Sequence, residues 1–597
     1  MQRLRQLLGE RAVWVRLAAL ALAAIAAVAL GFRLFSPAQI ETLIVQGGYP
    51  FMLALFAGLL FFAARVAAPR RTEWRAVLRR PGWGVAVVVA GTIFAVWSDT
   101  FAHKVLFDEY VLQGTAWHMH ATKEIGAPIR AYDFAGTWLA IDTFLDKRPY
   151  FFAFLVSLLH DLTGFRVENV YVVNVALTGL TLGIVFWLVR RLTARTGPAC
   201  LAVALLATLP LFGQNATGAG MEMHNLAMIG VAMVCATLFL ERPADADRLS
   251  LLVLAAALLA QCRYESAAFV APVAAIVAIG WWRAGRIVLP WVACLAPLLL
   301  VPYAWLDRFV QSKPILWQLR EGDTSRFALR YLEGNLAGAR RFFFGASAAQ
   351  PNSLWLTLVG LAALGAAVFA GVRWLRQPRD ARAQWAPVQM AVAWFGIFIA
   401  ANLGLLMFYY WSRLDEPIAS RFALPIYFAL AVLAGWAVHA LDRGWPATRL
   451  AAAGLAVWLL CFASGTYAHR FYTAHNQVML ELEWELAQVT ARPGPLLVIT
   501  SKATLPFLLQ RIPAVNTALA RGRGAEIAWH RNLGTFREVL VTRVLRPTTA
   551  EGDPMVDPED VLPDSFQLEP LAKKRFGGRW IEICRLTAIN AEPAPTQ

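Results

Sequence analysis

Charged residues are scarce in this chain of 597 residues, because Asp, Glu, Lys and Arg together make up only 16%. Soluble globular proteins carry about 25% charged residues. Hydrophobic residues reach 58%. These values exclude a disordered protein and an ordinary soluble enzyme, and they favour a chain that is largely buried in a membrane.

Cysteine is also scarce, with six residues in the whole chain. No two of them have the C-x-x-C spacing of a metal site, and only Cys584 lies outside the apolar segments. We therefore expect neither a disulfide framework nor a cysteine metal site.

Several nucleotide and metal motifs are missing. The sequence has no G-x-x-x-x-G-K-[ST] loop, no G-x-G-x-x-G after a strand and no H-E-x-x-H. These absences exclude a Walker-type ATPase and a zincin-type hydrolase. An activated substrate must then be made elsewhere, and a lipid carrier would suit a membrane protein.

Acidic residues are fewer than basic ones, which gives a net charge of +16. In a soluble protein this excess would suggest a nucleic-acid partner. In a membrane protein it indicates basic cytoplasmic loops and attraction to anionic lipid. We expect the lipid bilayer as partner and no nucleic acid.

Long hydrophobic runs are abundant. A helix needs about 20 apolar residues to cross about 30 Å of hydrocarbon. By this criterion we predict an all-α polytopic membrane protein with about thirteen spans. The predicted spans are 13–32, 48–68, 83–103, 168–189, 198–214, 224–240, 247–262, 266–282, 287–305, 353–375, 387–410, 422–441 and 449–467.

The orientation follows from the short loops. Alternate loops are rich in arginine, beginning with Arg3 and Arg5 before the first span, whereas the loop 213–223 has no Lys or Arg. Basic loops face the cytoplasm. We predict a bacterial inner-membrane protein with a cytoplasmic N-terminus and an extracytoplasmic C-terminal segment.

Three domains are predicted. Residues 1–82 form a two-helix extension, and residues 83–467 form the membrane core with a long external loop at 104–167. Residues 468–597 form a small α/β domain, with strand-like runs at 496–500, 539–545 and 580–586, a helix-like stretch at 506–511 and a surface loop at 551–564.

Asp108 and Glu109 follow the third predicted span. Paired carboxylates at a membrane surface suit a general base that faces an external acceptor. A solvated helix cap at the end of a span would give the same pattern.

Asp146-Lys147-Arg148-Pro149 precedes an apolar run too short for a span. We predict an amphipathic helix in the membrane interface, with Pro149 in its first turn. Lys147 and Arg148 would lie at the depth of a lipid phosphate, which Arg binds bidentately and Lys binds as a point charge. The alternative is ordinary snorkelling beside a membrane helix.

Ionisable residues also cluster near other external span ends. Glu222 and His224 open the sixth span, where helix capping is the alternative role. Arg263 and Glu265 lie in the turn after the seventh span, where a self-neutralising pair is the alternative. Arg421 precedes the twelfth span. His118 and His120 form only a weak metal signal, and we predict no metal site.

These residues resemble the polytopic glycosyltransferases of the C-type fold that use lipid-linked sugars, among them the bacterial aminoarabinose transferase and the protein O-mannosyltransferases. Asp108-Glu109 matches the family's external acidic pair, and Lys147-Arg148-Pro149 matches its Lys-Pro-Pro or His-Pro-Pro motif, with Arg148 replacing one proline. Matches elsewhere are Arg190-Arg191, Glu222 and the stretch from Arg421 to Pro425.

The resemblance implies an inverting transfer of a hexose or pentose from a polyprenyl-phosphate donor to an extracytoplasmic glycolipid, glycan or protein. It implies Asp108, paired with Glu109, as the catalytic base. It leaves a divalent metal possible and requires no other cofactor. The implied donor-phosphate ligands are Lys147, Arg148, Arg263 and Arg421, and the implied substrate-binding residues are Tyr110, Asp146, Glu222, His224 and Glu265.

Three alternatives fit a basic polytopic chain: a lipid or glycan transporter or flippase, an O-antigen-ligase-like enzyme, and a non-catalytic scaffold. Transporters usually show internal repeats and helices broken near the middle of the membrane. The ionisable residues of this sequence gather on one external face, which favours chemistry there.

Overall fold

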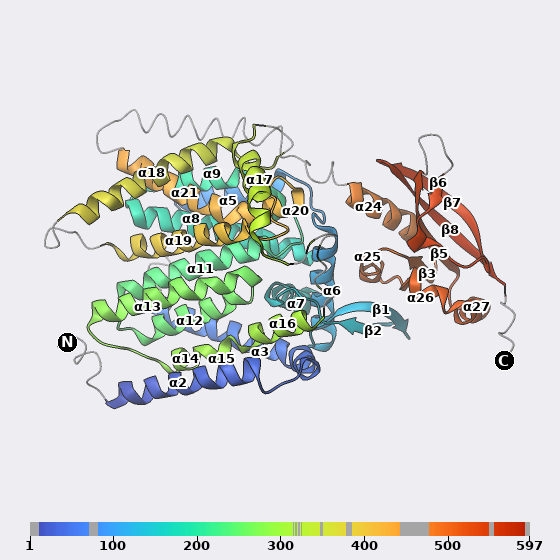
Figure 1. Ribbon diagram of the computed structural model, residues 1–597, viewed down its shortest axis with the longest axis horizontal. Coiled ribbons are helices and arrows are strands. Elements are labelled where there is room, and N and C mark those ends of the chain that lie inside the picture. The colour runs from blue at the N-terminus through green and yellow to red at the C-terminus, as the bar shows by residue number, and fades with distance from the viewer. Residues whose placement is uncertain are drawn as a thin grey trace. The chain divides into compact units, whose positions relative to one another are not determined.

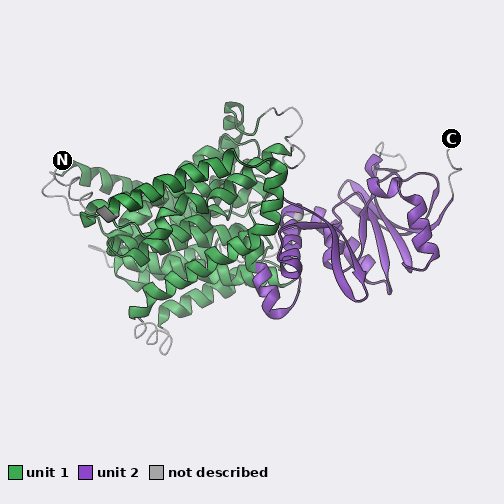
Figure 2. Cartoon of the chain, turned by 90° about the horizontal axis from the view of Figure 1, so that it is seen from below, with its two compact units in different colours: residues 1–102, 147–155, 168–472 green, residues 103–146, 156–167, 473–597 purple. Residues whose placement is uncertain are grey.

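The computed structural model describes residues 11–70, 82–313, 316, 319, 323, 325–346, 350–377, 385–441, 477–547 and 554–590. The chain divides into two compact units, each of which is described by itself (Figure 2). Unit 1 comprises residues 1–102, 147–155 and 168–472. Unit 2 comprises residues 103–146, 156–167 and 473–597.

Unit 1 is a bundle of apolar helices (Figure 1). Among the described residues, eight helical segments are long and apolar enough to cross a membrane, or nine if one bent pair counts as a single span. This confirms the all-α polytopic fold. The eight are α2 (Arg11–Phe32), α3 (Pro37–Ala67), α8 (Asn169–Thr193), α11 (Glu222–Glu241), η2–α13 (Tyr264–Ala284), α18 (Leu354–Arg376), α19 (Pro387–Leu406) and α20–α21 (Pro417–Ala440).

The count of thirteen spans is not confirmed. The predicted span 198–214 is the bent pair, α9 (Thr196–Ala207) and α10 (Pro210–Ala216), whose axes differ by 72°. The predicted spans 83–103 and 247–262 are the 15-residue helices α5 (Trp83–Trp97) and α12 (Ala246–Ala260). Each is about 22 Å long, less than the hydrocarbon thickness.

The predicted span 287–305 is broken. It forms the short helices α14 (Trp291–Cys294) and α15 (Ala296–Leu299), followed by α16 (Val301–Ser312). Pro290, Pro297 and Pro302 explain the breaks, since proline lacks the amide hydrogen that a helix interior requires. The predicted span 449–467 lies outside the described residues.

Close packing fixes the segment that leads into α11. A Cβ atom on Gly213 would lie 2.0 Å from Ser98 Oγ, so only glycine lets α10 approach this end of α5. The Asn174 side chain of α8 donates hydrogen bonds to the carbonyls of Gly218 and Gly220, at 2.8 and 3.0 Å. These contacts set where Glu222 begins its helix.

Unit 2 starts with α6 (Leu106–Thr122) and an antiparallel hairpin, β1 (Ala127–Phe134) and β2 (Thr137–Phe144). The two turn residues, Ala135 and Gly136, have φ angles of 51° and 85°. Positive φ at both positions is the geometry that joins tightly twisted hairpin strands. The Asp133 carboxylate accepts the Gly136 amide hydrogen at 2.6 Å and fixes the turn.

The rest of unit 2 is an α/β domain, as predicted. Its sheet has the order β4-β3-β5-β8-β7, with β6 paired to β5. Strand β3 is parallel to β4 and β5, and the other pairs are antiparallel. The strands are β3 (Leu496–Thr500), β4 (Ala514–Asn516), β5 (Glu538–Pro547), β6 (Pro554–Val556), β7 (Phe566–Phe576) and β8 (Arg579–Ile589), and the helices are α24 (Gln477–Thr490), α25 (Leu505–Leu509), α26 (Thr517–Arg521) and α27 (Gly524–Asn532).

The strands predicted at 496–500, 539–545 and 580–586 are confirmed, and α25 confirms the helix near 506–511. The described part of 551–564 is not simply a surface loop. It contains β6 and a 3₁₀ turn at Pro558–Asp560. The Asp560 side chain is only 3% exposed, and its carboxylate accepts the Val544 amide hydrogen.

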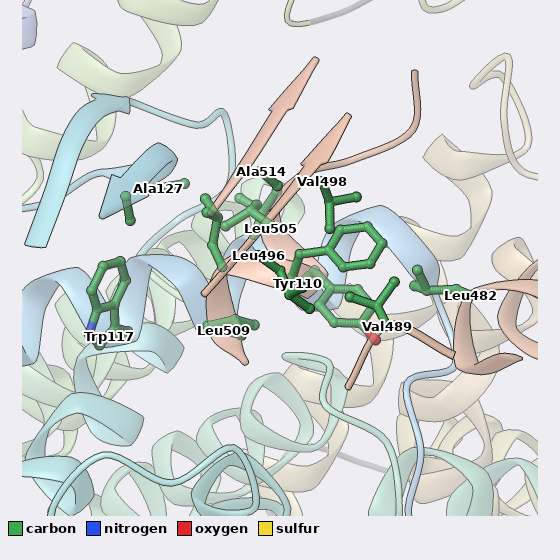
Figure 3. Close-up of a cluster of buried hydrophobic side chains, with 14 of the residues drawn as sticks. Tyr110, Trp117, Ala127, Leu482, Val489, Leu496, Val498, Leu505, Leu509 and Ala514 are labelled. Atoms are coloured by element: carbon green, nitrogen blue, oxygen red, sulfur yellow. The ribbon is translucent and has the colours of Figure 1, made fainter. Parts of the chain in front are cut away.

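One hydrophobic cluster joins segments of unit 2 that are far apart in sequence (Figure 3). Tyr110 and Trp117 of α6 share this core with Ala127 of the hairpin and with Leu496 and Leu505 of the C-terminal domain. Helix α6 is therefore part of the same folded body as the C-terminal sheet.

Candidate active site

Unit 1 brings three of the predicted residues together around one carboxylate. Glu222, the first residue of α11, accepts a hydrogen bond from Nη1 of Arg263 and forms an ion pair with Nη1 of Arg421, both through Oε1 and both at 2.7 Å. The three side chains are only 5–9% exposed. A shared, buried carboxylate holds two guanidinium groups side by side despite their like charge.

Two neighbours complete this cluster. Glu265 accepts a hydrogen bond from Nε of Arg263 at 2.5 Å and is 20% exposed. The ring of Phe422 lies 4.9 Å from the Arg263 guanidinium carbon and 5.9 Å from that of Arg421. An aromatic face next to desolvated cations adds to their stabilisation. We call Glu222, Arg263, Glu265, Arg421 and Phe422 the arginine cluster.

Short helical turns place these side chains. A 3₁₀ helix, η2 (Tyr264–Phe269), follows Arg263, and α20 (Pro417–Ser420) starts with proline just before Arg421. Ser266 donates a hydrogen bond to Asn225 Oδ1 at 2.6 Å and ties η2 to the first turn of α11. The irregular backbone between apolar helices is thus what gathers the charges.

His224 connects this cluster to the segment that carries Lys147 and Arg148. Its ring is fully buried and lies edge-on to Phe151, with 4.5 Å between ring centroids. Phe151 begins α7 (Phe151–Thr163), four residues after Lys147. Arg148 is 9% exposed. Four predicted segments of the chain therefore meet in unit 1.

The predicted short helix after Pro149 is α7, whose 13 residues are too few for a span. Pro149 was predicted in the first turn, but the helix begins two residues later, at Phe151. Pro149 precedes the first turn, and the Tyr150 carbonyl accepts the first helical hydrogen bond, from Phe154.

Asp108 and Glu109 belong to unit 2, in the first turn of α6. Glu109 is 2% exposed, and its Oε2 accepts the Lys104 amide hydrogen at 2.5 Å. One Glu109 oxygen therefore caps the backbone before α6. Asp108 is half-buried, and consecutive helical residues point about 100° apart, so the two carboxylates have different surroundings.

His103 is a residue of this site that the sequence analysis did not single out. Its ring stacks on Tyr110, with 3.8 Å between centroids, and its Nε2 donates to Gln113 Oε1 at 2.8 Å. Burial lowers the pKa of His103 to about 4, so the ring is neutral near pH 7. The only signal in the sequence is its position five residues before Asp108.

Helix α24 contributes a third carboxylate near α6. Burial raises the pKa of Glu483, and the positive charge of Lys104 partly offsets that rise. Burial raises the pKa of Tyr110 well above its usual value, and the charges of Glu109 and Glu483 add to that rise. The first turn of α6 is therefore held between its own preceding loop and the C-terminal domain.

Tyr110 and Asp146 were predicted to bind substrate. Tyr110 is 5% exposed and packs in the core of unit 2, so its ring presents little surface to a sugar. Asp146 is 8% exposed and immediately precedes Lys147. Their predicted roles stay predictions.

His118 and His120 have separate partners. His118 Nδ1 lies 3.1 Å from the Glu124 carbonyl, whereas His120 Nδ1 lies 2.7 Å from Asp161 Oδ1. Within the part of the chain that the structure describes, no three His, Cys, Asp or Glu side chains are arranged to hold a metal ion.

Comparison with known proteins gives one family match. Residues 147–305 match the family described as dolichyl-phosphate-mannose-protein mannosyltransferase. This segment starts at Lys147 and includes Arg148, Glu222, Arg263 and Glu265. A search of curated proteins found no match.

Three solved structures show distant similarity to this chain. The structure of ArnT from Cupriavidus metallidurans bound to undecaprenyl phosphate is 14% identical with a TM-score of 0.49, covering 86% of this chain and 100% of that chain. The Archaeoglobus fulgidus oligosaccharyltransferase is 11% identical with a TM-score of 0.41, and the similarity covers 79% of this chain and 72% of that chain. The Mycobacterium smegmatis arabinosyltransferase EmbB is 14% identical with a TM-score of 0.32, and the similarity covers 70% of this chain and 44% of that chain.

The helical polytopic unit and the matched segment resemble one class of protein, the membrane glycosyltransferases with the C-type fold. Within that class, the chain resembles the protein mannosyltransferases in the segment from Lys147 to Trp305. The match favours a glycosyltransferase over a transporter or flippase.

Proposed function

We propose that this protein transfers a hexose or pentose from a polyprenyl-phosphate donor to an acceptor outside the cytoplasmic membrane. The observation that carries the proposal is the convergence of Arg263 and Arg421 on Glu222. Glu222 and Arg263 lie in the segment that matches the mannosyltransferase family. Desolvated, preorganised cations are what a departing phosphate requires.

The chemistry is an inverting displacement. Asp108 removes the proton from an acceptor hydroxyl, whose oxygen attacks the anomeric carbon of the donor sugar. The bond from that carbon to the phosphate oxygen breaks, and the polyprenyl phosphate leaves with the electron pair. Lys147, Arg148, Arg263 and Arg421 stabilise the negative charge that develops on it.

Glu222 has a resting-state role in this mechanism. Without donor, its carboxylate lies between Arg263 and Arg421 and offsets their mutual repulsion, while Glu265 balances the second positive charge. A bound phosphate shares these same cations. His224 positions the first turn of α7 through Phe151, and with it Lys147 and Arg148.

The protein is a multi-pass membrane protein. We propose a cytoplasmic N-terminus and an extracytoplasmic C-terminal domain, because the arginine-rich loops alternate with loops that are poor in Lys and Arg. Labelling of single cysteines in the C-terminal domain of intact cells tests this orientation. Labelling only after the cells are permeabilised would contradict it.

The decisive experiment for the function uses the purified chain in lipid nanodiscs with polyprenyl-phosphate sugars. Release of free polyprenyl phosphate measures donor cleavage, and mass spectrometry of envelope glycolipids from cells with and without the protein identifies the acceptor. No difference in any envelope glycoconjugate, together with no donor cleavage, would reject the proposal.

A further inference from the structure

Unit 2 contains a cavity of about 440 Å³ that takes no part in the proposed transfer. The hairpin lines it with Tyr132, Phe134 and Ile141, and the C-terminal domain lines it with Leu519, Ile527 and Phe536. None of the predicted site residues borders it. Its size and its mostly apolar lining are typical of a small-molecule site.

The apolar lining extends to the surface. Phe134 and Ile141 are each 52% exposed, and Trp529 of α27, next to the lining residue His530, is 59% exposed. Large apolar side chains gathered at the wall of a cavity indicate a ligand that covers them. This ligand must carry a sizeable apolar part.

The charged lining residues are Arg130, Arg523 and Glu526. Arg523 pairs with Glu526 at 3.1 Å, with 50% and 61% of the side chains exposed, and Arg130 pairs with Asp142 at 33% and 43% exposed. Exposed ion pairs contribute at most about 1 kcal/mol. Both arginines can therefore turn to an anionic group at little cost, and they outnumber the single acidic lining residue.

We propose that this cavity binds a single-chain anionic amphiphile, with the acyl chain among the apolar side chains and a carboxylate or phosphate headgroup at Arg523 and Arg130. Arginine binds either headgroup through two parallel hydrogen bonds. The site is independent of the sugar transfer, and its occupancy is measured without any activity assay.

The test uses the full chain in nanodiscs of neutral phosphatidylcholine and a laurate that carries a terminal photoreactive diazirine. After illumination, mass spectrometry is expected to find adducts in peptides from residues 130–141 and 513–536. Unlabelled laurate and dodecyl phosphate should compete about tenfold better than dodecanol, because only they offer a charged acceptor to arginine. Dodecanol competing equally well, or adducts elsewhere only, would overturn the proposal.

Variants of the lining residues test whether the labelling depends on this cavity. Leu519→Trp fills the cavity and should abolish labelling, and Ile141→Asp, at a half-exposed position that tolerates a charge, should do the same if Leu519→Trp fails to fold. Arg523→Gln should reduce the preference for laurate over dodecanol, because only Arg130 then remains to bind the headgroup. Arg531→Gln, on α27 but outside the lining, is the matched control and should label normally. Undiminished labelling of both Leu519→Trp and Ile141→Asp would reject the site.

Changing the lipid composition of the nanodiscs shows where the ligand comes from. If nanodiscs that contain anionic phosphatidylglycerol suppress labelling, the cavity takes its occupant from membrane lipid. If labelling is unchanged, it takes a free amphiphile. Either result supports the site, and the two differ only in the origin of the anionic chain.

Discussion

Arg263 and Arg421 form ion pairs with the same oxygen atom, Oε1 of Glu222, at the same distance of 2.7 Å. Two cations from distant parts of the sequence are thus set at one point, where Glu222 and Glu265 balance their charge. An anion that reaches this point meets two guanidinium groups whose geometry is already fixed.

The first prediction concerns this shared carboxylate. Glu222→Gln removes the buried carboxylate that Arg263 and Arg421 share, and breaking such a pair typically costs about 3–5 kcal/mol. The variant should therefore have a markedly lower melting temperature in detergent. Glu265→Gln is the control, because Glu265 is more exposed and bonds only Arg263, and it should melt closer to the parent. Equal melting of both variants would contradict the central role of Glu222.

The second prediction concerns donor binding. Removing the charge in Arg421→Gln should raise the donor KM about tenfold to a hundredfold, since a charged hydrogen bond contributes about 1.5–3 kcal/mol. Arg413→Gln removes a charge that is 45% exposed and paired with Asp415, so its donor KM should stay near that of the parent. Steady-state release of polyprenyl phosphate measures both values, and a normal KM in Arg421→Gln would remove this residue from the phosphate site.

The third prediction separates the two carboxylates of α6. Asp108→Asn should lower turnover about 10²–10⁴-fold with donor binding retained, which is the usual contribution of a general base. Glu109→Gln should lower it less, and should instead lower the melting temperature, because Glu109 caps the Lys104 amide. If Asp108→Asn turns over normally while Glu222→Gln does not, the base lies in unit 1.

The fourth prediction is a pH dependence. The pKa of folded His103 is about 4, below its ordinary 6.5, so the unfolded chain binds a proton first as the pH falls. The stability contributed by the neutral ring is then full above pH 6.5 and is lost progressively down to about pH 4. In His103→Phe, which keeps a ring against Tyr110, melting temperature should fall less steeply between these pH values. A parallel fall in parent and variant would show that other groups cause it.

Much of the membrane fold could be predicted from apolar length alone, because a span must satisfy its backbone internally. Bends could not. Pro210, Pro290, Pro297 and Pro302 mark the positions where a helix can break, but packing decides whether it does. The hairpin of residues 127–144 was also missed, since its Ala135-Gly136 turn lacks the usual Asn-Gly signal.

The site was predicted as single residues and not as a geometry. Glu222, Arg263 and Arg421 could each be named as ionisable groups near span ends. That Glu222 pairs with both arginines through one oxygen atom depends on non-local packing of α11, η2 and the 3₁₀ turn η6 (Arg421–Ala423). His103 was missed because a histidine near an acidic pair has no characteristic spacing. Its role appears only once the ring is stacked on Tyr110.

The shared core of α6 and the C-terminal domain has a consequence for the order of synthesis. About 350 residues separate Thr122 from Gln477, and at about 5–20 residues per second they take about 20–70 s to translate. During that time Tyr110 and Trp117 lack those apolar partners that come from the C-terminal domain, such as Leu496 and Leu505. The helix that carries Asp108 therefore reaches its final form only after nearly the whole chain has left the ribosome, and a nascent membrane bundle cannot begin chemistry early.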